Sequence, residues 1–124
     1  MTIEQARSAA DGLRNNLIDR DVKKRMLSEL DGRIYYEIMN AYGKEGEFEG
    51  YSPTTPNDRE LLVPYPYDSL YIAYLEQELE RLSGELQRYN NASVLFNERY
   101  GAFSAWWMRT HTSDTPKLKF PTRR

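Results

Sequence analysis

The length of 124 residues fits one domain with one modest hydrophobic core. Seventeen basic and 19 acidic residues give a formal net charge of −2, which argues against a general attraction to nucleic acid or to anionic lipid. The absence of cysteine excludes disulfides and thiolate metal sites, and we expect neither a secretory signal nor a membrane span, because no apolar run has the required length.

The first predicted helix runs from about residue 3 to residue 14. Thr2 and Gln5 have the spacing of a capping box, in which each side chain binds the backbone N–H of the other residue. Asn15 and Asn16 are the predicted stop. The apolar residues at helical spacing behind the cap are Ile3, Ala6, Ala10, Leu13 and Leu17.

A second predicted helix begins after Asp19 or Asp21, either of which can cap it, and ends at Gly43. Gly32 lies inside this helix, at a cost of up to about 1 kcal/mol relative to alanine. It marks either the close approach of another helix or an exposed, tolerated position. The apolar face of the helix consists of Val22, Met26, Leu30, Ile34, Ile38 and Tyr42.

Residues 43–66 form a long predicted loop. They hold three of the seven glycines and four of the six prolines, so regular helix cannot form there. Three adjacent aliphatic residues in this loop, Leu61, Leu62 and Val63, would be costly to leave in water. We therefore expect the loop to lie as an extended strap on the chain's own helices or on a neighbouring subunit.

The strongest pattern is an apolar ladder in the second half of the chain, with alternating steps of four and three residues. A helix is expected to begin near Tyr67, with Asp68 or Ser69 as its N-cap. The ladder keeps its phase across Gly84, which favours one helix of about 43 residues over a break near that glycine. The ladder residues are Leu75, Leu79, Leu82, Leu86, Tyr89, Phe96, Tyr100, Phe103 and Trp107, with Ser93 in the one polar position.

Residues 112–124 follow the last predicted helix. Four basic residues, one acidic residue and two prolines predict an extended basic tail that no internal core can hold. We therefore divide the chain into a single helical domain, residues 1–111, and a tail, residues 112–124. The predicted fold is all-α: a bundle of three or four helices with a long C-terminal helix, a long loop and the tail.

No catalytic or metal-binding motif is present. A metal site needs several converging ligands, whereas the single histidine, His111, is typical of a cation at the end of a helix. The glutamates of residues 76–85 have the spacing of a charged helix face that pairs with Arg81 or Arg88. We therefore expect no enzymatic activity and no cofactor.

Tyrosine is abundant, with ten copies against four phenylalanines and two tryptophans. Its apolar ring and polar tip suit interfaces, although a tyrosine-rich monomer core is the alternative. Trp106 and Trp107 are adjacent, so they project about 100° apart on a helix and cannot fill the same stripe. The predicted subunit-interface residues are Leu61, Leu62, Val63, Tyr67, Tyr71, Trp106 and Trp107.

Several short motifs resemble a family of small phage and prophage proteins from Gram-positive hosts. The motifs are residues 27–34 (LSELDGRI), 60–64 (ELLVP), 66–71 (PYDSLY), 84–85 (GE), 88–91 (RYNN), 96–97 (FN) and 109–111 (RTH). Their specificity comes from their number and order, because none is a catalytic signature. The similarity covers residues 2–111, and the family resembles the head-tail connector, or neck adaptor, proteins of long-tailed phages.

The resemblance implies an all-helical subunit that assembles into a ring, commonly a dodecamer, between the portal protein and the next neck protein. DNA would pass through the ring as transient cargo, and no cofactor or enzymatic role is implied. The protein would be made in the bacterial cytoplasm and located in the neck of the virion. The resemblance does not extend to residues 45–50 or to the tail.

The charge, proline content and position of the tail favour the portal protein as its partner. The predicted portal-binding residues are Lys117, Leu118, Lys119, Phe120, Arg123 and Arg124. A competing interpretation is a cytoplasmic helical interaction module, in which the ladder is an internal core. Nucleic-acid binding is a third possibility, but the four basic residues of the tail are too few for strong non-specific binding at physiological salt.

Overall fold

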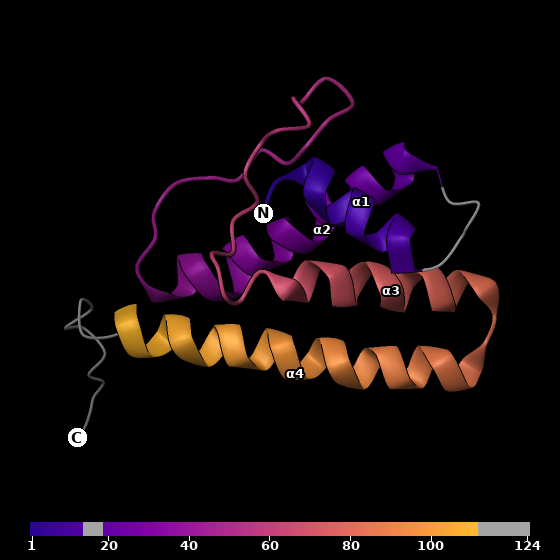
Figure 1. Cartoon of the computed structure of the whole chain (residues 1–124). Coiled ribbons are helices and arrows are strands. Elements are labelled where there is room, and N and C mark those ends of the chain that lie inside the picture. Colours follow the sequence, from indigo (N-terminus) through magenta and orange to yellow (C-terminus); the bar gives the residue numbers. More distant parts are fainter. Residues whose placement is uncertain (14–18, 112–124) are drawn as a thin grey trace.

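The computed structural model describes residues 1–13 and 19–111, and over these residues the fold is all-α (Figure 1). The elements are α1 (Ile3–Leu13), α2 (Arg20–Ile34), the π-helical turn η1 (Tyr35–Met39), the 3-10 turn η2 (Asn40–Tyr42), α3 (Ser69–Ser83) and α4 (Leu86–His111). No strand forms in this part of the chain, where one isolated bridge joins Thr2 and Glu60. The predicted all-α fold with a long C-terminal helix is confirmed.

The capping box at the start of α1 is confirmed. The backbone N–H of Thr2 donates to Gln5 Oε1 at 2.9 Å, and the N–H of Gln5 donates to Thr2 Oγ1 at 3.1 Å. The helix buries Ile3, Ala6 and Ala10. The predicted stop at Asn15 and Asn16 and the apolar Leu17 lie outside the described residues.

The second helical segment begins and ends where the sequence predicts. Asp19 is its N-cap and accepts a hydrogen bond from the N–H of Asp21 at 2.8 Å. The helical path passes from α2 through η1 and η2 to Gly43, whose φ of +113° ends it. At Gly32, an added Cβ would meet the Phe48 ring at 3.7 Å, so a loop side chain, and not another helix, covers this glycine.

The long loop docks on its own protomer. It contains no helix between Gly43 and α3, as its prolines predict, and two strap residues, Leu61 and Val63, are buried in the core. Its backbone is fixed by the N-terminal segment, because the N–H of Leu61 donates to the carbonyl of Met1 at 2.9 Å. Of the two predicted positions for the strap, the structure has the one on the chain's own helices.

The prediction of one continuous C-terminal helix, which the ladder favoured, is wrong. The chain breaks at Gly84, whose φ of +81° ends α3, and α4 returns antiparallel to α3 (Figure 1). Each half of the ladder then lines one arm of a hairpin, so Leu75 of α3 and Phe96 and Phe103 of α4 enter the same core. Asp68 occupies the N-cap position of α3, as predicted, but its side chain makes no capping hydrogen bond and instead accepts from the N-terminal ammonium of Met1 at 3.4 Å.

The backbone at Gly84 should make this position sensitive to substitution. Gly84→Ala should lower the free energy of unfolding by about 1–2 kcal/mol, because an L residue is strained at φ +81°. Gly101→Ala, inside α4, should instead raise it by up to about 1 kcal/mol. An added Cβ meets nothing within 4 Å at either glycine, so the two variants differ in backbone conformation alone. Urea unfolding followed by circular dichroism measures both, and equal changes would contradict the prediction.

Candidate functional site

A buried carboxylate joins the strap to two helices. Asp31 of α2 is fully buried, and its Oδ1 accepts from the hydroxyl of Tyr71 on α3 at 2.6 Å. Its Oδ2 accepts from the hydroxyl of Tyr51 at 2.5 Å and from the N–H of Leu62 at 3.1 Å. The Tyr71 hydroxyl also accepts from the N–H of Val63 at 2.8 Å. Three motifs of the family resemblance therefore meet in one hydrogen-bond network.

The burial of this network shifts its proton equilibria. Burial raises the pKa of Asp31, and the hydrogen bonds from Tyr51, Tyr71 and the N–H of Leu62 oppose that rise. Burial and the nearby Asp31 carboxylate raise the pKa of both tyrosines, so their hydroxyls stay protonated as donors. The network orders the strap and offers no accessible reactive atom, so its role is structural.

Aromatic rings cluster at the C-terminal end of α4. Tyr67 stacks on Trp106 with 5.2 Å between ring centroids, and Trp107 stacks on His111 with 3.6 Å between centroids. Phe103 lies beneath both tryptophans and is fully buried. The rings of Tyr67, Trp106 and Trp107 are only partly buried, so this cluster presents aromatic surface beside the last helical residue.

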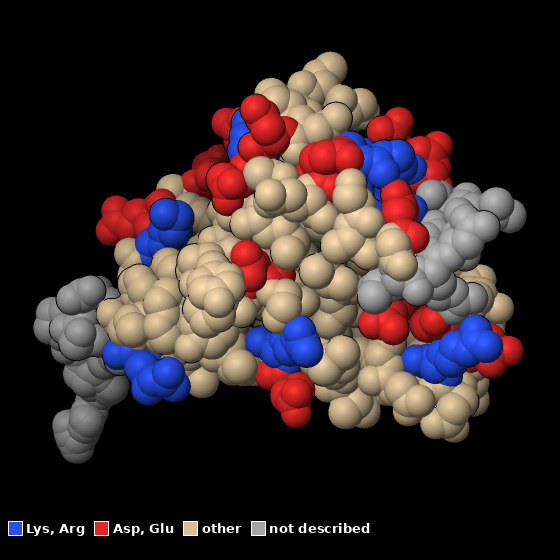
Figure 2. Space-filling view, in the orientation of Figure 1, with Lys and Arg blue, Asp and Glu red and all other residues tan. Residues whose placement is uncertain are grey.

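Apolar side chains are also exposed on α4 and at the tip of the hairpin. Leu82 and Leu86, which flank the turn at Gly84, are 49% and 71% exposed, and Val94 is 69% exposed. Met108, which directly follows Trp106 and Trp107 in the sequence, is 36% exposed. Figure 2 shows uncharged surface between separate clusters of basic and acidic side chains in the lower half of the molecule, where α4 lies. The arrangement suits contact with another protein more than chemistry on a small molecule.

A buried lysine organises the loop at the opposite side of the helical hairpin. Lys24 of α2 is 4% exposed, and its Nζ donates to the carbonyls of Thr55 at 2.5 Å and Pro53 at 3.4 Å. It also donates to Asn57 Oδ1 at 3.0 Å. These three acceptors satisfy the ammonium, so Lys24 closes the loop and is not free to hold a ligand.

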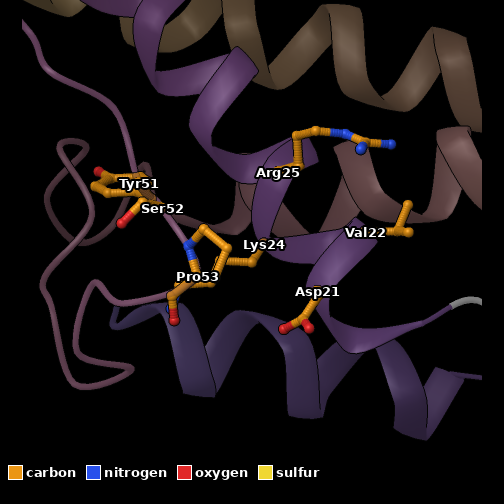
Figure 3. Close-up of a pocket in the computed structure, with 7 residues that line it drawn as sticks. All are labelled: Asp21, Val22, Lys24, Arg25, Tyr51, Ser52 and Pro53. Carbon is orange, nitrogen blue, oxygen red and sulfur yellow. The ribbon is translucent and has the colours of Figure 1, made fainter.

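A pocket of about 230 Å³ lies beside Lys24, between α2 and residues 51–53. Figure 3 shows Lys24 directed toward Pro53, whereas Arg25 and Val22 extend to the other side of the view. The pocket contains no pair of carboxylates and no nucleophile–base pair among its lining residues. It therefore supports no catalytic assignment.

The structure separates the seven predicted interface residues into three groups. Leu61, Val63 and Tyr71 lie inside the protomer and have no surface to offer a second copy in this conformation. Leu62, on the strap, is partly buried and packs against the core. The other three residues, Tyr67, Trp106 and Trp107, come together in the aromatic cluster, and their interface role stays a prediction.

The roles of Asp31 and Lys24 were not predicted from the sequence. For Asp31, the available signal was its position, because it lies four residues after Leu27 and one after Leu30, on the apolar face of the helix. The exposed Val94 and Met108 were missed because they lie off the ladder. All six predicted portal-binding residues, from Lys117 to Arg124, lie outside the described residues.

No family model, curated protein or solved structure matches this chain. Within residues 1–13 and 19–111, no three histidine or acidic side chains are placed to hold a metal ion. In the same part of the chain, no helix is long and apolar enough to cross a membrane.

Proposed function

We propose that this chain is a head-tail connector subunit of a long-tailed phage. It forms a ring between the portal protein and the next neck protein, and DNA passes through the ring. The observation that carries the proposal is the ordered set of motifs that resembles this family. The buried network supports it, because Asp31 of one motif accepts hydrogen bonds from Leu62 and Tyr71 of two others.

The exposed surface is compatible with a ring. Cyclic assembly through one repeated contact requires two different faces on each subunit. The chain has partly exposed aromatic rings at the end of α4 and exposed aliphatic side chains at the hairpin tip, Leu82 and Leu86. Burying such side chains between subunits supplies a favourable free energy of association.

The competing function is a helical interaction module without a ring. The observation that favours this function is the internal packing of the ladder, because Leu75, Phe96 and Phe103 are buried within one protomer. The exposed surface that remains would then bind one partner, and the tail would have no role.

Portal binding separates these functions. The full chain, mixed with the portal ring of the same phage, should add a ring of density on the portal in electron micrographs. Deletion of residues 112–124 should weaken portal binding at least about tenfold, equivalent to 1.4 kcal/mol. A variant with Lys117, Lys119, Arg123 and Arg124 changed to glutamine keeps the tail length and tests its charge.

Undiminished binding after the deletion would contradict the portal-binding role of the tail, but it would not contradict the connector proposal. A full chain that neither binds the portal nor occurs in the neck of the phage particle would contradict the connector proposal and favour the interaction module.

A further inference from the structure

The outward side of α4 has no partner in the described part of the chain. Leu86, Asn97 and Met108 are exposed and follow one another at intervals of 11 residues, close to three helical turns. Between them, on the same side of the helix, lie the exposed Val94 and Gly101. This uncharged stripe covers the length of the helix, roughly 33 Å at 1.5 Å per residue.

A row of arginines runs along the same helix. Arg88, Arg99 and Arg109 are separated by 11 and 10 residues, so they lie on one side of α4 and span roughly 32 Å. Figure 2 shows basic side chains in separate clusters along the region of α4. No hydrogen bond or ion pair joins these three arginines to another described residue. Arg33 and Arg81, by contrast, are paired with Glu37 and Glu78.

Negatively charged side chains are concentrated in one loop, residues 45–49, which we call the acidic loop. Glu45, Glu47 and Glu49 are all exposed, and none of them forms an ion pair with a described residue. Phe48, between two of these glutamates, turns inward and packs on Tyr35 with 5.9 Å between ring centroids. Because successive side chains of an extended backbone point to opposite sides, the carboxylates of Glu47 and Glu49 point toward solvent.

This acidic loop is held in place by several contacts with the second helical segment. The Tyr35 hydroxyl donates to the carbonyl of Glu45 at 3.0 Å, and the N–H of Phe48 donates to the Tyr36 hydroxyl at 3.1 Å. Asn40 Nδ2 donates to the carbonyl of Lys44 at 3.0 Å. A fixed loop loses little conformational entropy on binding, which favours its use as a docking element.

The acidic loop and the arginine row lie on different flanks of the protomer. The loop packs on η1 and η2, and η1 borders α4 at Tyr100, whose hydroxyl donates to Glu37 at 3.0 Å. At 100° per residue, Arg99, Arg88 and Arg109 point about 100°, 120° and 180° away from Tyr100 around the axis of α4. The loop therefore cannot reach the arginine row of its own protomer.

We propose that α4 docks a second copy of this chain through its outward side and the adjoining flank, where the acidic loop of that copy pairs with the arginine row. The inference rests on the proposed function, since it specifies the contact between neighbouring subunits. Each protomer presents the arginine row on one flank and the carboxylates on another, which is the arrangement that a head-to-tail contact requires. Charge complementarity sets the register, and the uncharged stripe supplies apolar area.

A protein partner fits this surface better than DNA does. Arg88 lies on the flank of α4 toward α3, where it lines a shallow pocket with Glu76 and Glu80, and this flank presents no continuous cationic surface to a phosphate backbone. Phosphate recognition would require a denser cationic surface than three arginines spaced over roughly 32 Å.

Reciprocal charge reversal tests the pairing. One variant carries Arg88→Glu and Arg99→Glu, and the other carries Glu47→Lys and Glu49→Lys. Each variant alone should self-associate at least about tenfold more weakly than the wild type, because like charges meet at every contact. An equimolar mixture should recover assembly, since each reversed helix then meets a reversed loop. Sedimentation velocity over a range of protein concentrations measures association, in the free chain and on the portal ring.

A matched control reverses two exposed arginines outside α4, with Arg25→Glu and Arg59→Glu, and should assemble like the wild type. Circular dichroism checks that each variant is folded. Higher salt should weaken wild-type association, because the paired side chains are exposed or partly exposed to solvent.

Assembly of the wild type that neither reversal weakens would overturn the inference and leave the ring proposal standing. Two weakened variants whose mixture stays unassembled would also overturn it, since the two surfaces would not meet each other. A third outcome would overturn the inference and assign the arginine row to DNA. In that outcome, the chain does not self-associate, either free or on the portal ring, but binds a DNA duplex in a way that depends on the arginines. Failure of the portal test, by contrast, counts against the proposed function itself.

Discussion

Asp31→Ala should lower the free energy of unfolding by about 3–5 kcal/mol, which is a large part of the stability of a small domain. The substitution removes the acceptor of three buried donors: the hydroxyls of Tyr51 and Tyr71 and the N–H of Leu62. Each donor left without a partner in the interior costs free energy that water cannot restore. Urea denaturation followed by circular dichroism measures the loss.

The matched control for this variant is Asp58→Ala, which removes an exposed carboxylate from the same loop region. Its effect should stay within about 0.5 kcal/mol. A loss at Asp31 no larger than that at Asp58 would contradict the role of the buried network.

Asp31→Asn isolates the pH dependence of the same carboxyl. Because burial raises the pKa of Asp31 above its ordinary value, the folded state binds this proton more tightly than the unfolded state. Its contribution to stability is fully present below the unfolded pKa and is lost as the pH rises through the folded pKa. The wild type should therefore gain stability relative to Asp31→Asn as the pH falls toward 3.8.

Comparison with the asparagine variant is needed because Glu4 acts in the opposite direction. Its hydrogen bonds to Arg7 and Arg20 lower the pKa of Glu4 from 4.5 to about 2. The stability that Glu4 contributes is present above 4.5 and is lost as the pH falls toward 2. The difference between wild type and variant cancels this effect, and a difference that does not change with pH would contradict the assignment to Asp31.

Phe103→Ala should cost about 3–5 kcal/mol, the range for truncating a buried aromatic side chain. Phe103 is 0% exposed, and its ring lies 6.0 Å from the ring of Trp106 and 6.1 Å from that of Trp107, measured between centroids. The cavity would remove the support beneath both tryptophans. Thermal unfolding measures the stability, and tryptophan fluorescence reports the change around the indole rings.

Val94→Ala on the same helix provides the comparison. Val94 is 69% exposed, so its truncation should change the stability by no more than about 0.5 kcal/mol and leave the fluorescence unchanged. Equal losses for the two variants would show that α4 does not pack on the core through its Phe103 side.

The sequence predicts the candidate surface only in part. Tyr67, Trp106 and Trp107 were recognised by residue type, and the structure brings them together. Leu61 and Tyr71 were chosen on the same grounds but are buried. An aromatic or aliphatic side chain gains free energy by leaving water in either place, so its type cannot distinguish the core of one chain from a contact between two chains.

The sequence by itself determined the local features of this protein. The capping box at Thr2 and Gln5, the end at Gly43 and the helix-free loop depend on residues a few positions apart, and short-range hydrogen bonding and steric rules suffice to predict them. For the cap of the second helical segment, these rules left Asp19 and Asp21 as alternatives, and the structure has Asp19.

Only the tertiary structure decided the reversal at Gly84 and the convergence of Asp31, Tyr51 and Tyr71. A ladder with constant phase fits a straight helix and a hairpin equally well, because periodicity specifies which side of a helix is apolar and not what covers it. The covering partner depends on contacts between residues distant in sequence, and the free energy of those contacts is gained only when the whole chain packs.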